Sequence, residues 1–149
     1  MDSTASIPDV GLTPTLLVRG GGDDASLYGC DIRDAHEVIP LRPMTRLPGA
    51  PACVRGLINL RGTIVTVLDL GVRLDATRPV TADGSILLVR IGEHVAGLVV
   101  GEVVDVRSIA VDETTPSANE GITRGIATVD DTAVVVLDLD ALLMQVLRF

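Results

Sequence analysis

Short runs of aliphatic residues separated by turn-forming residues follow one another along the whole chain. A run rich in Val, Ile and Leu and bounded by Gly, Pro, Asp or Asn is typical of a β-strand, and many such runs at close spacing are typical of small barrels. The pattern predicts few helices and about ten short strands in two sets of five. The runs lie at residues 15–19, 26–29, 37–41, 55–60 and 63–68 in the first half and at residues 86–90, 94–100, 101–111, 122–128 and 132–137 in the second.

One stretch of sixteen residues occurs twice. Residues 55–70 are RGLINLRGTIVTVLDL and residues 124–139 are RGIATVDDTAVVVLDL, and eight of the sixteen aligned positions are identical without a gap. The preceding strands also recur in order, since TLLVR at 15–19 resembles ILLVR at 86–90. An internal repeat of this kind predicts two five-stranded barrels side by side. The sequence leaves open whether each repeat closes its own barrel or the two repeats exchange strands.

This organisation predicts a single domain over residues 14–149. The polar and acidic stretch at 1–13 is expected to be a flexible tail. The first repeat spans about 14–75, a polar connector spans 76–84, and the second repeat spans about 85–149. A chain of 149 residues is long enough for the two repeats to share one core.

Helical turns are predicted at three places. Asp31 can cap a turn that leads into the strand at 37–41, with a bent strand as the alternative. Asp69 precedes a second turn, and the residues from Asp138 onwards form an amphipathic C-terminal helix capped by Asp138 or Asp140. Because Asp69 and Asp138 occupy the same place in both repeats, both carboxylates are expected to accept backbone N–H groups at a helix start.

Residues shared by the two copies are expected to build the fold, and residues peculiar to one copy are better candidates for function. Gly56 and Gly125 are shared, which indicates an unusual backbone conformation or a close approach between strands. Asn59, Arg61 and Gly62 occur only in the first copy. Asn59 can satisfy backbone groups of a turn. Arg61 can pair either with an acid of this protein or with an acid of a partner, and both interpretations stay open.

The composition restricts the classes of partner. Hydrophobic residues make up 47% of the chain, but only Tyr28 and Phe149 are aromatic, so the core is expected to be aliphatic. All 12 basic residues are Arg and the net charge is −8, with neither a basic stripe nor a set of stacking aromatic residues. Nucleic acid is therefore disfavoured as a partner.

Candidates for catalysis are sparse. His36 and His94 fall in unrelated places, Cys30 and Cys53 lack the spacing of a metal site, and most carboxylates lie in turns. The thiols are expected to be buried and structural, and the sequence predicts no enzyme, no metal and no cofactor. The N-terminus lacks the pattern of a secretory signal and no apolar run approaches a membrane span, so a cytoplasmic location without membrane insertion is expected.

The stretch TRLPGAPACVRGLINLRGTIVTVLDL, residues 45–70, resembles the signature of the CheW-like family, R-x-P-x-A-P-x-x-V-x-G-x-x-N-L-R-G-x-I-x-P-V-x-D-L. Upstream, YGCDIRDAHEVI at 28–39 resembles the family's Y-G-I-D-I-x-x-V-x-E-I. The resemblance covers residues 14–147, with two departures: Thr66 replaces the usual Pro, and Ala35 replaces a larger aliphatic residue. The residues in register with the signature are Pro48, Ala50, Pro51, Val54, Gly56, Asn59, Leu60, Arg61, Gly62, Ile64, Val67, Asp69 and Leu70.

The resemblance implies an all-β fold of two five-stranded Src-homology-3-like barrels with a short C-terminal helix, and a function without catalysis. Members of this family are adaptors in bacterial chemosensory arrays. They join the cytoplasmic tips of methyl-accepting chemoreceptors to the histidine kinase CheA, through the regulatory domain of that kinase. The implied partners are therefore a CheA-type kinase and receptor tips, and the implied location is cytoplasmic, with recruitment to membrane-associated arrays.

Two other hypotheses are compatible with a small barrel protein. One is an adaptor of the same fold in a non-flagellar pathway, such as pilus motility or development. The other is a small enzyme or ligand-binding barrel, which requires a pocket with convergent polar residues. The sequence offers no such constellation, so the adaptor is favoured.

The resemblance also implies two binding regions. Contacts to the kinase would use Arg55, Gly56 and Leu57 at the end of a barrel. Contacts to the receptor would use an apolar groove in which Gly97 permits close backbone approach, with Arg61 beside it. The residues of this predicted receptor groove are Ile32, Ala35, Val38, Arg61, Val95, Gly97 and Val99, and the residues expected to be structural are Asn59, Gly62, Asp69, Gly125 and Asp138.

Overall fold

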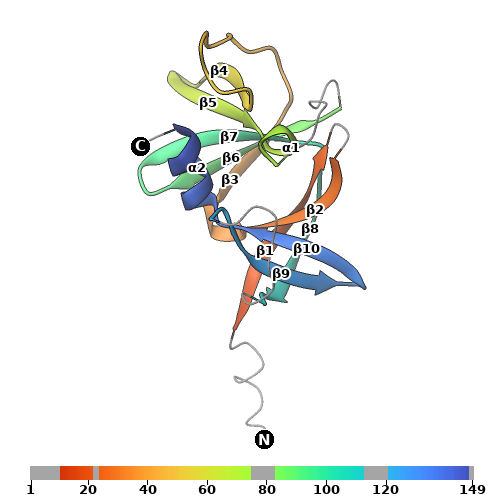
Figure 1. Cartoon of the computed structure of the whole chain (residues 1–149). Helices are drawn as coiled ribbons and strands as arrows, with labels where there is room; N and C mark the ends of the chain where they lie inside the picture. Colours follow the sequence, from red (N-terminus) through yellow and green to blue (C-terminus); the bar gives the residue numbers. More distant parts are fainter. Residues whose placement is uncertain (1–10, 22–23, 75–82, 113–120, 148–149) are drawn as a thin grey trace, which may run out of the picture.

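The computed structural model of the protein describes residues 11–21, 24–74, 83–112 and 121–147. These residues form two five-stranded β-sheets, each curled into a small barrel, one above the other in Figure 1. The elements in chain order are β1 (Leu12–Gly21), β2 (Asp24–Asp31), the 3₁₀ helix η3 (Ile32–Asp34), β3 (Ala35–Pro40), β4 (Val54–Leu60), β5 (Thr63–Asp69), α1 (Leu70–Arg73), β6 (Ser85–Ile91), β7 (His94–Val100), β8 (Glu102–Ala110), β9 (Thr123–Val129), β10 (Thr132–Leu137) and α2 (Leu139–Leu147). The predicted all-β fold with two five-stranded barrels is confirmed.

The two repeats exchange strands between the barrels. Barrel A, the lower sheet in Figure 1, has the strand order β8-β1-β2-β10-β9, and barrel B, the upper sheet, has the order β3-β6-β7-β5-β4. Four strand pairs join the repeats: β1 with β8 and β2 with β10 in barrel A, and β3 with β6 and β5 with β7 in barrel B. Neither repeat therefore closes a barrel by itself.

The largest hydrophobic cluster lies between the barrels. Among the described residues this cluster contains 17 buried side chains, whereas the interiors of barrels A and B contain seven and six. Both repeats contribute to it, with Leu68 and Leu98 from barrel B, Leu16 from barrel A and Leu142 from α2 among its members. The side chains that fill it are aliphatic apart from Tyr28 and Cys30, as the composition predicts.

Aspartates begin the helical segments, as predicted. The Asp69 carboxylate accepts a hydrogen bond from the Val72 backbone N–H at 3.0 Å, and the Asp138 carboxylate accepts one from the Ala141 N–H at 3.1 Å. Asp31 caps η3 by accepting from the Arg33 N–H at 2.9 Å. A side-chain acceptor at this position satisfies a backbone donor that the first turn leaves free.

The duplicated glycines close the two barrels. The segment after β3 bridges to β4 through Thr45 and Leu57, and the residue two positions beyond β8 bridges to β9 through Asp112 and Ile126. A Cβ atom on Gly56 would collide with the Thr45 carbonyl oxygen, and one on Gly125 with the Asp112 carbonyl oxygen. The φ angles of these glycines are 148° and 158°. The close approach that the repeat predicts is thus observed at both glycines, where the backbone of one segment lies against the backbone of the segment that closes the barrel.

Two element boundaries differ from the sequence prediction. β1 begins at Leu12 and not after residue 13, because Leu12 and Thr13 pair with Ala110 and Ile109 of β8. The helical turn after Asp31 spans only η3, since residues 35–40 pair with β6 as strand β3. The tail at residues 1–10 and most of the connector, residues 75–82, lie outside the described residues.

We expect that neither repeat folds alone. A fragment of residues 11–74 contains β1–β5, which belong to two different sheets and lack the inter-repeat partners on both. Circular dichroism and amide proton dispersion of this fragment should show an unfolded chain, whereas mixing it with the fragment of residues 83–149 should restore β-structure. A cooperative thermal transition for either fragment alone would contradict the exchange of strands.

Candidate functional site

The predicted receptor groove divides between two faces of barrel B. Side chains of sheet B point alternately into the barrel and toward the core between the barrels, because successive residues of a strand face opposite sides. On β7, Val95 and Val99 pack with the interior of barrel B, whereas Ala96 and Leu98 belong to the core between the barrels. The residues that the sequence grouped together therefore do not form one continuous surface.

The first part of the groove consists of Ile32 in η3 and of Ala35 and Val38 on the outer side of edge strand β3. Ile32 and Ala35 are half-buried and pack against the core between the barrels. Val38 is paired in register with Leu87, whose side chain belongs to the same core, but Val38 itself is 47% exposed. This edge presents an aliphatic side chain to solvent beside an otherwise packed core.

The second part of the groove lies inside the barrel, which corrects the prediction for two residues. Val99 is fully buried and Gly97 is buried, so neither lines a surface. A Cβ atom on Gly97 would lie 2.9 Å from Cγ2 of Ile86 and 3.1 Å from Cγ2 of Val67. Gly97 therefore makes room for the packing of the barrel interior, and not for the backbone of a partner. Val95 is half-buried at the barrel mouth.

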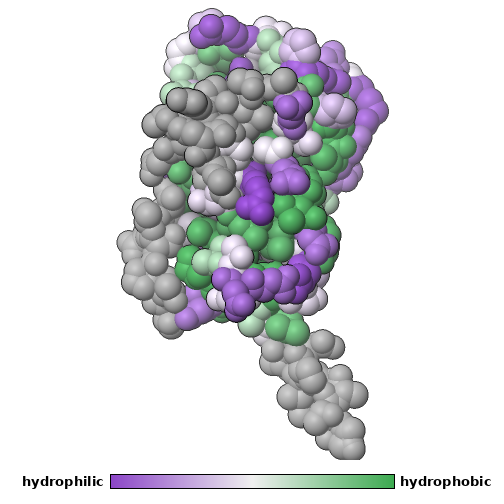
Figure 2. Space-filling view, turned by 90° about the vertical axis from the view of Figure 1, so that its right-hand side faces the viewer, coloured by the Kyte–Doolittle hydropathy of each residue, from purple (hydrophilic) through white to green (hydrophobic). Residues whose placement is uncertain are grey.

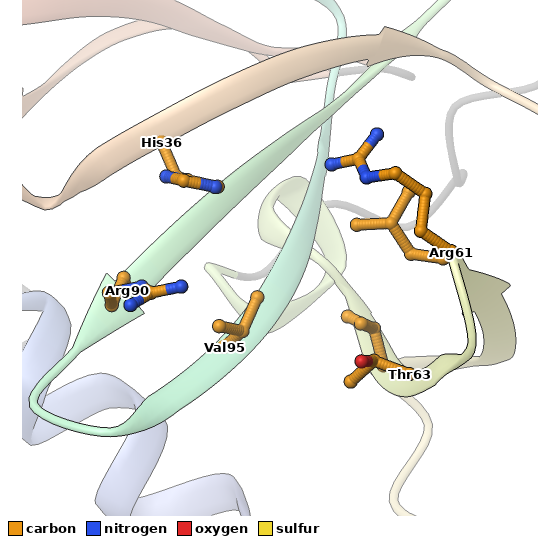
Figure 3. Close-up of a pocket in the computed structure, with 7 residues that line it drawn as sticks. His36, Arg61, Thr63, Arg90 and Val95 are labelled. Atoms are coloured by element: carbon orange, nitrogen blue, oxygen red, sulfur yellow. The ribbon is translucent and has the colours of Figure 1, made fainter.

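Arg61 lies at the tip of the β4–β5 hairpin, which it turns together with Gly62. The φ angles of these residues are 49° and 88°, both positive, as a two-residue turn of type I′ requires. The side-chain oxygen of Asn59 accepts a hydrogen bond from the Gly62 backbone N–H at 2.9 Å, so Asn59 stabilises the turn as predicted. The turn projects the Arg61 side chain over the mouth of barrel B (Figure 3).

The Arg61 guanidinium forms an ion pair with Glu37 of β3. The Nη2 to Oε1 distance is 2.7 Å, and the two side chains are 64% and 35% exposed. The hydrogen bond from Arg61 lowers the pKa of Glu37 below its ordinary value and raises the pKa of Arg61. Arg61 thus has an acidic partner within the protein and still presents most of its side chain to solvent.

Barrel A contains an ion pair of the opposite polarity between the corresponding elements. Asp130, at the tip of the β9–β10 hairpin, accepts hydrogen bonds from Arg107 of β8, the shorter at 3.0 Å. Arg61 and Asp130 occupy the same position of the sixteen-residue repeat. Each hairpin tip is therefore tied to the edge strand of its own barrel, with acid and base interchanged.

The three residues predicted to contact the kinase have different environments. The Arg55 guanidinium lies 2.9 Å from the carboxylate of Asp69, whose side chain is only 1% exposed, so Arg55 braces the start of α1. Gly56 is buried beneath the Thr45 backbone, which corrects its assignment to a contact surface. Leu57 is half-buried and lines a surface hollow with Pro43 and Met44. Leu57 is the apolar residue of the three that reaches the surface.

Sequence reasoning missed an apolar hollow beside α2. It has a volume of about 470 Å³ and lies between the loop after β3, strand β5 and the end of α2. Leu47, which lines it, is 44% exposed, and Ile64, two positions before the lining residue Thr66, is 61% exposed, although both belong to the signature stretch. In the second repeat, the position that corresponds to Ile64 is Ala133. A large aliphatic residue in only one of the two copies was the signal in the sequence that could have indicated this surface. The residues lining the hollow are Leu47, Pro48, Gly49, Ala50, Pro51, Val54, Thr66, Val146 and Leu147.

Groups that could support catalysis are not gathered within the described part of the chain. Both cysteines are free and buried, and burial raises the pKa of the Cys30 thiol to about 12, which leaves it protonated and unreactive. No set of three His, Cys, Asp or Glu side chains among the described residues could hold a metal ion. None of the described helices is long and apolar enough to cross a membrane.

Comparison with known proteins decides the family. A model of the CheW-like domain matches residues 14–146. The chain belongs to the CheW-like family.

Individual members of the CheW-like family resemble the chain over most of its length. The chemotaxis protein CheW of Klebsiella aerogenes is 29% identical, over 78% of this chain and 74% of its own. A probable chemotaxis protein CheW of Rhizobium etli is 29% identical, over 77% and 79%. The crystal structure of the scaffolding protein TtCheW from Thermoanaerobacter tengcongensis superimposes with a TM-score of 0.73 at 33% identity and covers 85% of this chain and 86% of its own. Membership places the chain among the adaptor scaffolds of chemotaxis.

Gly56 provides a test of barrel closure in this CheW-like chain. Gly56→Ala should lower the free energy of unfolding by about 3 kcal/mol or more, because it combines an unfavourable φ with a collision against the Thr45 backbone. The matched control is Gly92→Ala in the β6–β7 turn, where φ is 62° and a Cβ atom meets nothing within 4 Å. This control should cost about 1 kcal/mol in chemical denaturation. Equal losses would contradict the closure.

The Arg61–Glu37 pair predicts a pH dependence. Because the pKa of Glu37 is lower in the folded chain, the pair stabilises the fold above the pKa of the unfolded chain, and this contribution is lost as the pH falls through the folded value. An NMR titration should give a pKa for Glu37 below the ordinary 4.5, and Arg61→Gln should raise it toward that value. Arg46→Gln, which removes another exposed arginine, should leave the titration of Glu37 unchanged. A pKa that does not respond to Arg61→Gln would exclude the pair in solution.

Proposed function

We propose that this chain is a non-enzymatic adaptor that couples the cytoplasmic tips of chemoreceptors to a CheA-type histidine kinase. The observation that carries the proposal is the match of the CheW-like domain to residues 14–146. The likeness to a solved scaffolding protein over 85% of the chain supports it. The adaptor works in the cytoplasm and is recruited to receptor arrays at the membrane.

The surface of the chain suits an adaptor. Figure 2 shows hydrophobic residues across the middle of one face, with hydrophilic residues above and below. Exposed aliphatic side chains occur on both barrels, with Val38 on β3 of barrel B and Val104 and Val106 on β8 of barrel A. Exposed apolar patches of this kind are typical of protein interaction surfaces. The exposed edge at β3 and the hollow around Leu57 are separate surfaces, which allows two partners to bind at once.

The receptor contact uses the outer side of β3 and the adjacent barrel mouth. Val38 supplies the exposed apolar contact, Ile32 and Ala35 support it from the core, and Arg61 offers donors to an acidic side chain of the receptor helix. A helical receptor tip docks an apolar stripe against such an edge. Gly97 and Val99 act only through the packing beneath this surface.

The kinase contact uses the end of barrel B around Leu57. Leu57 and the neighbouring Pro43 and Met44 supply the apolar surface, while Arg55 and Gly56 hold the backbone in place. Interfaces of this size are weak individually, and an ordered array strengthens them through multivalency.

The same adaptor chemistry suits a non-flagellar pathway such as pilus motility or development, because the partners would be receptors and kinases of the same classes. Neighbouring genes and co-purified partners distinguish the pathways. The adaptor proposal itself does not depend on which pathway the chain serves.

Val38→Asp tests the receptor contact. The substitution should weaken binding to a receptor tip fragment by about tenfold or more, because the contact would have to desolvate a carboxylate. Binding to the regulatory domain of the CheA-type kinase should stay within about twofold of the native value, since the proposed kinase surface is elsewhere. Both affinities are measured by surface plasmon resonance.

Val106→Asp is the matched control for this experiment. Val106 pairs with Leu16 in β1 as Val38 pairs with Leu87 in β6, and the two valines are 50% and 47% exposed. Receptor binding should survive Val106→Asp. Equal loss in both variants would place the contact elsewhere, and a native chain that binds neither the receptor tip nor the kinase domain would disprove the adaptor function.

A further inference from the structure

The mouth of barrel B contains a small basic hollow, termed here the mouth pocket. Its volume is about 280 Å³, near the lower limit for sites of drug-sized ligands, so it can hold one small group. Figure 3 shows His36, Arg61, Thr63, Arg90 and Val95 around the same open space. The residues lining the pocket are His36, Leu60, Arg61, Thr63, Val65, Arg90 and Val95.

Three features of the backbone bring the basic groups together. A shift of register between Ala35 and Glu37 leaves His36 without a partner in β6, and such a bulge redirects a side chain. Arg90 is paired with Val95, so its side chain lies on the interior side of the sheet, at the rim. The turn at Arg61 places the third basic group across the mouth from them (Figure 3).

The floor of the mouth pocket is apolar. Val65 is 1% exposed and belongs to the interior core of barrel B, and Leu60 and Val95 pack against that core. Charge interactions above such a floor are stronger than in open water, because fewer water molecules screen them. The hydroxyl of Thr63 adds a hydrogen-bond donor at the rim.

The charge of the mouth pocket is opposite to that of the chain. All three titratable side chains that line it are basic, whereas the whole chain has a net charge of −8. Glu37, which does not line the pocket, forms an ion pair with Arg61 and also interacts with His36. Within the described part of the chain, Arg90 has no hydrogen-bond or ion-pair partner, so its guanidinium donors are free for a ligand.

Barrel A does not reproduce this arrangement. Asp130 and Asp131 replace Arg61 and Gly62 at the tip of the second hairpin, and Val104 occupies the bulge of β8 that corresponds to His36. The basic lining is therefore specific to barrel B and is not a requirement of the fold.

We propose that the mouth pocket binds one compact oxyanion, a carboxylate or a phosphate, held by the free guanidinium of Arg90 with His36, Arg61 and Thr63 around it. The planar guanidinium matches either group with two parallel hydrogen bonds. This inference goes beyond the adaptor function and does not depend on it.

NMR titration of the full chain with sodium phosphate and, in a second arm, with sodium acetate tests the proposal. Saturable shifts are expected for the His36 imidazole and the Val95 methyl groups, beyond those seen in sodium chloride of equal ionic strength. Saturation with phosphate alone assigns a phosphate ligand, and saturation with acetate alone assigns a carboxylate, such as an acidic side chain. Saturation with both supports an oxyanion site that accepts either group. His94, which does not line the pocket, serves as the internal reference.

Arg90→Gln should weaken the binding by about tenfold, because it removes a charge-assisted pair of hydrogen bonds. Arg46→Gln removes an exposed arginine that does not line the pocket and should bind as the native chain does. Both substituted side chains are exposed, so the melting temperature should be unchanged in each variant. Shifts that match sodium chloride, or equal affinities in the two variants, would overturn the proposal.

Discussion

The apolar layer between the barrels takes side chains from both repeats, and the arrangement of every other element follows from it. Strands β1 and β2 reach barrel A from the first repeat, while β6 and β7 reach barrel B from the second. The inward faces of these strands meet in one core, closed at the side by α2. Burial of aliphatic surface is the dominant favourable term in folding. Because the largest share of it lies between the barrels, we expect neither barrel to be stable without the other.

Much of this architecture could be predicted because its signals are local. An aspartate before a helical turn, the two residues at the tip of a hairpin and the glycine shared by the repeats each act on the backbone within a few residues of their own position. The exchange of strands could not be predicted, since β2 pairs with β10 across the whole chain. The hydrophobic pattern of a strand does not determine which other strand it pairs with.

The same limit explains the outcome for the candidate site. The apolar run at β7 predicts a strand, but only the register shows that Val95 and Val99 face the interior of barrel B while Ile32 and Ala35 face the other core. Arg61 was recognised as special because it belongs to one repeat only. Its ion pair with Glu37 could be identified only from the structure, because the two residues are 24 positions apart in the sequence. The sequence left open whether Arg61 pairs with an acid of this protein or with an acid of a partner. The two alternatives are compatible, because Arg61 pairs with Glu37 and most of its side chain stays exposed.

The two hairpins β4–β5 and β9–β10 are near copies, and a chain with interleaved repeats must distinguish them while it folds. A hairpin closed onto the wrong edge strand would bring Arg61 toward Arg107, or Asp130 toward Glu37. Like charges would repel in both mismatched closures, whereas the native closures bring opposite charges together. The reversed polarity of the two ion pairs therefore disfavours the closure of either hairpin onto the edge strand of the other barrel, which is the misfolded pairing that a duplicated sequence favours most.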